Sequence, residues 1–312
     1  MRSRIQPDEP SYIIPHKIIK RIVWAVMLFA FVISTIFYII PTYRYYYIPE
    51  ELTPYDILPK QADDTLRIAM IGDSWADDQT MLSGDTMIIN AAKKIYDKPV
   101  IVKTRGKKGA LSKEIYFFMF NEKTEEHAYE PDRCTQPLLE EHPDYCVIFA
   151  GINDVTYLRR TNYYAENMHL IIRHLLHNHI RPVVIEIPIV NFTEPMGRKR
   201  FKERWFYKIR SILTGTSRNK GEDYQNALKE KLAQYNLQDS VVYIAVKQWN
   251  PKGSVDTTTF LPDHLHLNLN GYHILDSCII SEIIKDYTNK AGNNKRLPTN
   301  SPTQELIPIE YP

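Results

Sequence analysis

Residues 66–75 read LRIAMIGDSW, an apolar run from Leu66 to Gly72 followed at once by Asp73, Ser74 and Trp75. A short apolar run that ends in polar residues is typical of a strand buried on both faces. In open α/β sheets, active sites form just outside the carboxyl ends of the strands. Ser74 therefore lies where a reacting serine is expected.

Four more apolar runs of strand length follow, and segments with a helical period separate them. The runs are VIVKT ending at Thr104, YCVIFAG ending at Gly151, PVVIEIP ending at Pro188 and VVYIAV ending at Val246; the helical segments are 80–96, 111–120, 162–179, 197–213, 224–235 and 271–287. Right-handed crossovers place helices on both faces of a parallel sheet. This alternation predicts a three-layer α/β/α domain around a parallel sheet.

Two further polar clusters fall at the same predicted sheet edge. The third run leads into Gly151-Ile-Asn153-Asp154, and residues 261–268 read LPDHLHLN, with Asp263 and His266 three residues apart. A serine hydroxyl is a weak nucleophile at neutral pH and needs a base beside it. We expect His266 to be that base, with His264 as the alternative, and Asp263 to hold the imidazole.

Acyl transfer also requires donors for the oxygen that becomes negative in the transition state. The side-chain amide of Asn153 and the backbone N–H groups of Ser74 and of a glycine are the candidates. The sequence thus predicts a serine nucleophile, a histidine–aspartate pair and an oxyanion hole.

These motifs, in this order, resemble the four blocks of the SGNH or GDSL hydrolase superfamily over about two hundred residues. The blocks are Gly72-Asp73-Ser74, a glycine after the second strand, Gly151-x-Asn153-Asp154 and Asp263-x-x-His266. The resemblance implies a flavodoxin-like fold, ester or acyl-transfer chemistry, and neither a metal nor an organic cofactor.

The glycine block matches the family pattern least well. Members of this family often have an asparagine five residues before the oxyanion glycine. We prefer Gly109 to Gly106 as that glycine, and the residue five positions before Gly109 is Thr104. Trp75 stands where the family commonly has leucine, so the resemblance does not predict the acyl pocket of this chain.

An uncharged run of 19 residues, from Ile22 to Ile40, can cross a hydrocarbon core of about 30 Å. It is too long for the apolar region of an ordinary cleaved signal, the competing reading. Lys17, Lys20 and Arg21 precede it, so the N-terminus is expected in the cytoplasm and the domain outside a bacterial inner membrane. The expected organisation is 1–21 cytoplasmic, 22–41 anchor, 42–64 stalk, 65–289 catalytic domain and 290–312 flexible tail.

Histidines and cysteines give no metal-ligand spacing. His169, His174, His177 and His179 share one predicted helix, but no HExxH motif accompanies them, and we expect them to be solvated. The three cysteines, Cys134, Cys146 and Cys278, allow at most one internal disulfide and are expected to be buried thiols.

A basic segment runs from Arg198 to Lys220, although the whole chain has a formal charge of only +2, which argues against a nucleic-acid binder. Within it, Phe201, Trp205, Ile209 and Leu213 recur every four residues. This pattern fits a helix packed on the domain, a face that lies on anionic headgroups, or a rim that attracts an acidic glycan.

The leading hypothesis is an anchored, extracytoplasmic esterase or acyltransferase that acts on acyl esters, O-acetyl included, of a cell-surface polysaccharide. A lipid esterase is the nearest alternative, and a glycan-binding assembly protein without turnover is the alternative of a different class.

Overall fold

The computed structural model describes residues 15–46, 52–57, 63–81, 84–120, 131–189, 200–215 and 221–294. The chain divides into two compact units, Met1–Tyr47 and Ile48–Pro312. We describe each unit by itself.

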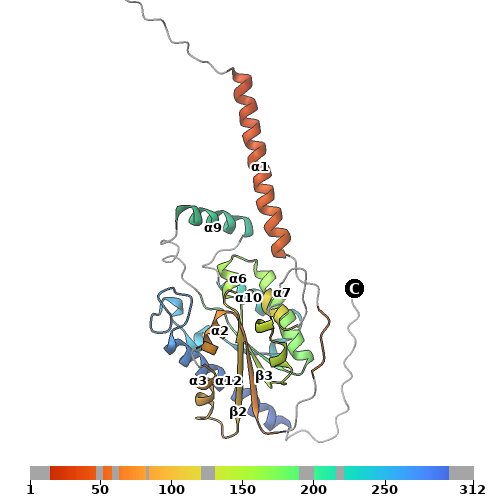
Figure 1. Ribbon diagram of the computed structural model, residues 1–312, viewed down its shortest axis with the longest axis vertical. Helices are drawn as coiled ribbons and strands as arrows, with labels where there is room; N and C mark the ends of the chain where they lie inside the picture. Colours follow the sequence, from red (N-terminus) through yellow and green to blue (C-terminus); the bar gives the residue numbers. More distant parts are fainter. Residues whose placement is uncertain are drawn as a thin grey trace, which may run out of the picture. The chain divides into compact units, whose positions relative to one another are not determined.

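The N-terminal unit contains one helix, α1, from His16 to Tyr46 (Figure 1). Its section His16–Ile36 has a mean hydropathy of 1.9 and none of it is buried, so by length and composition it can cross a membrane. The helix is longer at both ends than the predicted anchor 22–41, because the polar residues that flank the apolar run also continue the helix.

The second unit is built on a five-stranded parallel sheet in the order β2-β1-β3-β4-β5. The strands are β1 Leu66–Gly72, β2 Val100–Gly106, β3 Tyr145–Phe149, β4 Arg181–Ile185 and β5 Val242–Ile244. All five predicted runs are strands, and the predicted parallel sheet is confirmed. In this strand order the direction of winding reverses at β1 and β3, where such folds bind their ligands.

Both faces of the sheet are buried, because successive side chains of a strand point to opposite faces. Ile68 and Met70 of β1 join one apolar cluster, whereas Ala69 and Ile71 join the other. Strands buried on both sides read as continuous apolar runs, which is the pattern of LRIAMIG.

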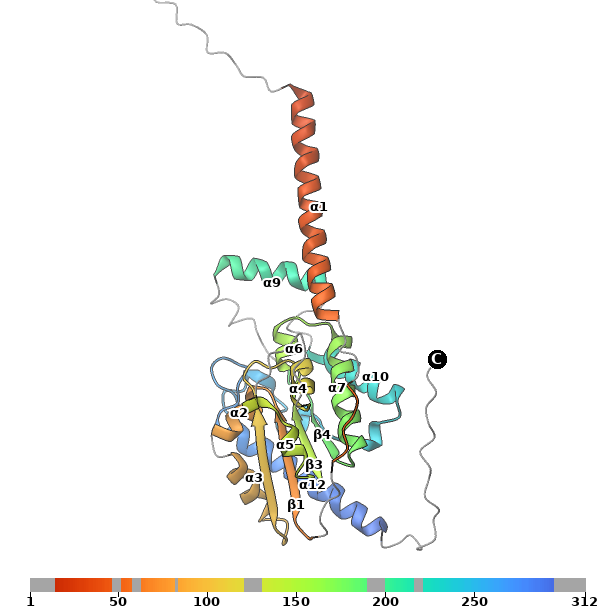
Figure 2. The ribbon, with the colours of Figure 1, turned by 45° about the vertical axis from the view of Figure 1, so that its right-hand side comes forward.

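Helices cover the two faces and complete the three layers (Figures 1 and 2). Apolar residues of α3 and α12 belong to one cluster, and those of α4, α7 and α10 belong to the other. In the described part of this unit the α-helices are α2 Ser74–Met81, α3 Gly84–Ala92, α4 Ser112–Phe118, α5 Gln136–Leu139, α6 Ile152–Thr156, α7 Thr161–His177, α9 Phe201–Thr214, α10 Gly221–Gln234, α11 Val246–Trp249 and α12 Leu269–Asn294.

The helical segment expected at 80–96 is replaced by two helices. α2 already begins at Ser74, directly after the strand, and α3 begins at Gly84. The apolar period alone did not reveal α2, because its sequence SWADDQTM is mostly polar.

Part of the expected stalk 42–64 packs on the catalytic domain. Leu52, Tyr55 and Ile57 lie against the apolar cluster of α4 and α7, and the Tyr55 hydroxyl donates to the carbonyl of Met119 at 2.6 Å. At the other end, α12 continues to Asn294, beyond the predicted boundary at 289, and residues 295–312 of the expected tail lie outside the described residues.

Two of the histidines expected to be solvated are buried. His169 stacks on Tyr235, and His174 lies against Tyr55 and Phe120. Desolvation lowers the pKa of each imidazole to about 4, so both are neutral core residues at pH 7. The three cysteines are free; Cys134 and Cys146 are buried, and Cys278 is half-buried.

Candidate active site

Ser74, His266 and Asp263 form a continuous hydrogen-bonded row. His266 Nε2 lies 3.1 Å from Ser74 Oγ, and His266 Nδ1 lies 2.6 Å from Asp263 Oδ2. Ser74 is the first residue of α2, whereas the other two belong to the loop before α12. The structure therefore brings together the three residues that the sequence selected, from segments almost two hundred positions apart.

The chemistry of the partners fixes the imidazole tautomer. An ionised carboxylate only accepts hydrogen bonds, so the proton of His266 lies on Nδ1 and leaves Nε2 free to accept from the Ser74 hydroxyl. Burial alone would raise the pKa of Asp263, but hydrogen bonds from the His266 ring, His266 N and Leu265 N outweigh it and hold that pKa below its ordinary value. Asp263 is thus a carboxylate at neutral pH.

His264, the alternative base, is directed elsewhere. Its Nδ1–H donates to the carbonyl of Ser254 at 2.9 Å, and its backbone adopts a left-handed φ of 57°. This geometry favours His266 as the partner of Ser74.

Asn153 lies at the start of α6 and is buried beside the serine loop. Its Nδ2 donates to the carbonyl of Ala110 at 3.0 Å and makes a longer contact of 3.4 Å to Asp73 Oδ2. The chain can enter α6 here because Gly151 has a φ of 110°, and a Cβ on it would lie 2.3 Å from Ile187.

The bond to Ala110 also brings the loop after β2 next to Asn153. Gly109 in this loop has a φ of 78°, and open space surrounds the position of a Cβ. Gly106 instead lies under α2, where a Cβ would meet Asp77 N at 2.4 Å and the Asp73 carbonyl at 2.6 Å. Gly106 is thus accounted for by packing, and Gly109 stays the predicted oxyanion donor.

Asp154 fixes this loop from the other side. Its fully buried carboxylate accepts from Ser112 N at 3.0 Å and from Ser112 Oγ at 2.8 Å, at the beginning of α4. Desolvation raises the pKa of Asp154 to about 6 in spite of these bonds. The motif GIND marked Asp154, but its partner Ser112 could not be identified without the fold.

Trp75 braces the loop that carries the histidine. Its Nε1–H donates to the carbonyl of Leu265 at 3.1 Å, and its ring meets Trp249 edge-on. The loop is also closed by a bond from Leu261 N to the His266 carbonyl at 2.8 Å. A leucine at position 75 could not make the indole bond, so this chain holds its base with a contact of its own.

Replacing Trp75 with phenylalanine should lower kcat/KM about tenfold, because a net hydrogen bond next to His266 is worth about 1 kcal/mol and some packing is lost with it. Trp249→Phe is the matched control, since the buried Nε1 of Trp249 has no partner among the described atoms. Steady-state hydrolysis of an activated acetate ester measures both variants. Equal losses in the two would show that the indole bond has no role.

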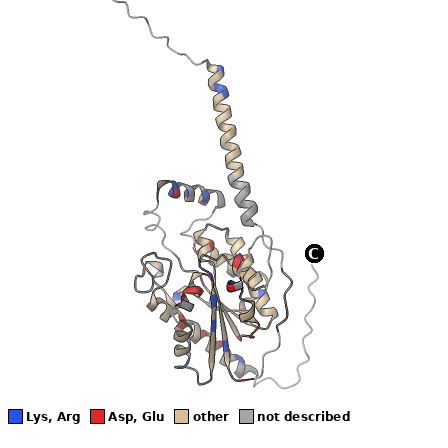
Figure 3. Cartoon of the chain, viewed as in Figure 1, with Lys and Arg blue, Asp and Glu red and all other residues tan. Residues whose placement is uncertain are grey.

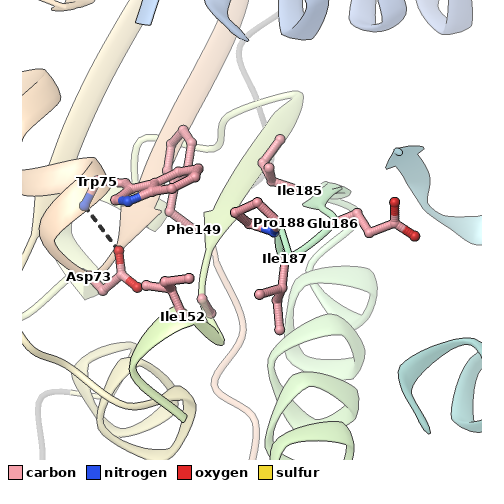
Figure 4. A pocket seen from close by; sticks show the side chains of 9 residues that line it. Asp73, Trp75, Phe149, Ile152, Ile185, Glu186, Ile187 and Pro188 are labelled. Carbon is pink, nitrogen blue, oxygen red and sulfur yellow. Dashed lines mark hydrogen bonds between the residues drawn. The ribbon is translucent and has the colours of Figure 1, made fainter. Parts of the chain in front are cut away.

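Asp73 is a buried carboxyl group that precedes Ser74 in the chain and contacts Asn153. It accepts from Trp75 N at 3.0 Å and is only 1% exposed (Figure 4). Desolvation raises its pKa from 3.8 to about 8, further than the Trp75 bond can offset.

This shift predicts that stability decreases with rising pH. Between pH 4 and pH 8 the folded protein keeps a proton on Asp73 that the unfolded chain releases, so the free energy of unfolding falls by at most about 1.4 kcal/mol per pH unit from this group. In Asp73→Asn that contribution disappears. Chemical denaturation of both proteins at pH 5, 6 and 7 should therefore show a shallower decline in the variant, whereas parallel declines would assign Asp73 an ordinary pKa.

A small cleft with a cavity volume of about 20 Å³ lies beside the nucleophile (Figure 4). Both chain neighbours of Ser74, Asp73 and Trp75, line it together with the neighbour of Asn153, Ile152. Its remaining lining is mostly apolar and comes from the ends of β3 and β4: Phe149, Ala150, Ile185, Glu186, Ile187 and Pro188. In the part of the chain that the structure describes, no group of three or more histidine, cysteine or acidic side chains could hold a metal ion.

Comparison with known proteins gives one family. The model of the GDSL-like Lipase/Acylhydrolase family matches residues 70–274, which is more than half of the chain. None of the curated proteins compared with this sequence matches it.

Several solved structures are similar at low identity. A GDSL-like lipase from Bacteroides thetaiotaomicron has a TM-score of 0.45 and 16% identity, over 71% of this chain and 88% of that one. A lipase/acylhydrolase from Enterococcus faecalis has a TM-score of 0.47 and 18% identity, over 71% of this chain and 96% of that one. The psychrotrophic esterase EstA from Pseudoalteromonas sp. has a TM-score of 0.48 and 13% identity, over 73% of this chain and 100% of that one.

Proposed function

This chain belongs to the GDSL-like lipase/acylhydrolase family and is a serine hydrolase, and from that premise we propose that it is a membrane-anchored esterase or acyltransferase that acts, outside the cytoplasmic membrane, on short acyl esters of a cell-surface polysaccharide. The observation that carries the proposal is the row Ser74–His266–Asp263, with Nε2 3.1 Å from the serine oxygen. In this row His266 can activate the serine hydroxyl that forms a covalent acyl intermediate.

The reaction follows from the positions of the protons. His266 Nε2 takes the hydroxyl proton as Ser74 Oγ attacks the ester carbonyl, and Asp263 stabilises the imidazolium that forms. The N–H groups of Ser74 and Gly109 and the Asn153 amide donate to the resulting oxyanion, the amide giving up its longer contact with Asp73. Collapse breaks the ester bond, and the leaving alcohol takes the proton from His266.

The acyl-enzyme is then resolved by a second nucleophile. Water gives hydrolysis, and a sugar hydroxyl gives transfer; in both cases His266 removes the proton and returns it to Ser74. The two outcomes share every residue of the site.

The shape of the site supports a short acyl group on a bulky alcohol. The cleft beside Ser74 has a cavity volume of about 20 Å³, far below the roughly 300 to 1,000 Å³ of the sites that drug-sized ligands occupy. On the other side the His266 and Asp263 side chains are 29% and 47% exposed, so an alcohol that is part of a polymer can stay in solvent. The span His16–Ile36 supports the anchor, and Lys17, Lys20 and Arg21, which precede its uncharged run from Ile22, support a cytoplasmic N-terminus.

A chain-length series tests the proposal on the full-length protein in detergent or nanodiscs. We expect p-nitrophenyl acetate to have at least about a tenfold higher kcat/KM than the octanoate, since a long chain exceeds the cleft, and acetate to be released from an O-acetylated polysaccharide. A preference for octanoate that rises on lipid vesicles would favour the lipid esterase instead. If the protein hydrolysed neither the p-nitrophenyl esters nor the O-acetylated polysaccharide, the result would favour the glycan-binding alternative.

A further inference from the structure

Helix α9 exposes a row of large apolar side chains to solvent. Phe201, Trp205, Ile209 and Ile212 are 67%, 53%, 41% and 73% exposed. Their spacings of four, four and three residues put them on one face of a helix. We call these four residues the apolar stripe; a single exposed apolar residue is ordinary, but an aligned set marks an interaction surface.

The same helix carries a strong positive charge. From Arg200 to Thr214 there are five basic residues and one acidic residue, a net charge of 5 − 1 = +4 (Figure 3). Helical spacing places Arg204 and Lys208 along one edge of the apolar stripe. Long basic side chains at such an edge can keep their charge in water while their stems cover apolar surface.

We propose that α9 binds a phospholipid surface that carries anionic headgroups, namely the outer leaflet of the membrane that α1 crosses. The apolar stripe would enter the boundary between headgroups and acyl chains, and the basic residues would contact lipid phosphates. Phe and Trp on one face with Lys and Arg on the other is the composition of interfacial helices. This chemistry distinguishes a lipid surface from an acidic glycan, which complements the charge but gives Phe201 and Trp205 little apolar surface to enter.

The covalent structure makes a membrane available to this helix. Only residues 47–51 separate the end of α1 from Leu52, which already packs on the catalytic domain. A short tether gives a high effective concentration of the domain at the surface, so a weak interfacial helix suffices to hold it there. The proposal rests on α1 as an anchor and not on the catalytic role of Ser74.

The test uses Trp205 as a reporter in the full-length chain in vesicles. Trp24→Phe removes the tryptophan of α1, and Trp75 and Trp249 are buried at 3% exposure each. Phospholipids brominated on their acyl chains should then quench Trp205 emission in vesicles that contain phosphatidylglycerol. We expect the quenching to fall at least about twofold in phosphatidylcholine alone or in high salt.

Variants on the two faces of α9 serve as matched controls. Phe201→Ser combined with Ile212→Ser should lower the quenching at least about twofold, whereas Glu203→Gln should leave it unchanged or raise it. An unchanged far-UV circular dichroism spectrum and melting temperature show that each variant is folded. Absence of quenching in phosphatidylglycerol vesicles, or protection of Trp205 by an acidic polysaccharide instead, would overturn the proposal.

Discussion

Replacing Ser74 with alanine should lower kcat on p-nitrophenyl acetate by about 10⁶-fold. The change removes the hydroxyl that lies 3.1 Å from His266 Nε2, which is the atom assigned to form the acyl-enzyme. The oxyanion donors remain, but without the nucleophile they can stabilise only attack by water. Initial rates of the full-length protein, corrected for the buffer rate, measure the loss.

A second serine gives the control for this variant. Ser277 lies on α12 and its hydroxyl donates to the His273 carbonyl at 2.7 Å, away from the site. Ser277→Ala should keep the wild-type rate, and both variants should keep the far-UV spectrum and melting temperature. Turnover in Ser74→Ala at even a hundredth of the wild-type rate would exclude Ser74 as the nucleophile.

Asp263→Asn should lower kcat by about 10⁴-fold, less than the loss of Ser74. The amide can still accept from Leu265 N and His266 N through Oδ1, so the loop keeps its shape. Its NH₂ group, however, faces His266 Nδ1 and favours the tautomer with the proton on Nε2. That tautomer cannot accept the Ser74 proton, and no negative charge stabilises the imidazolium.

Asp256 offers a matched comparison in the same region of the chain. Its carboxylate accepts from Thr258 N at 3.0 Å and from Thr258 Oγ1 at 2.6 Å, and it has no histidine partner. Asp256→Asn should change kcat less than about twofold. If the two asparagine variants lost activity equally, the effect of Asp263 would be that of loop structure and not of the imidazole.

The sequence was sufficient to predict the sheet, and it selected three candidate site residues that the structure brings together. Strands buried on both faces leave long apolar runs, and the polar residues that follow β1 and β3 mark one edge of the sheet. Asp263 and His266 could be paired because they are close in sequence. Their proximity to Ser74 was predicted from the sheet edge and from the resemblance to a family, and the structure gives the distance between His266 Nε2 and Ser74 Oγ as 3.1 Å.

The contacts that sequence could not supply join distant segments. Nothing in the sequence around Trp75 indicates that its indole reaches Leu265, or that Asp154 holds Ser112. The burial of His169 and His174 was also missed, because a polar residue on the packed face of a helix has the same spacing as a solvated one. Residues 52–57 lack any period, so their packing on the domain was not visible either.

The most direct test of the account is to label the full-length protein with a fluorophosphonate and measure the intact mass and the peptide map. We predict one adduct per chain, on Ser74, with none in Ser74→Ala and slower labelling in Asp263→Asn. An adduct that persists in Ser74→Ala, or a wild-type protein that takes no label while it hydrolyses p-nitrophenyl acetate, would contradict the assignment of Ser74 as the nucleophile.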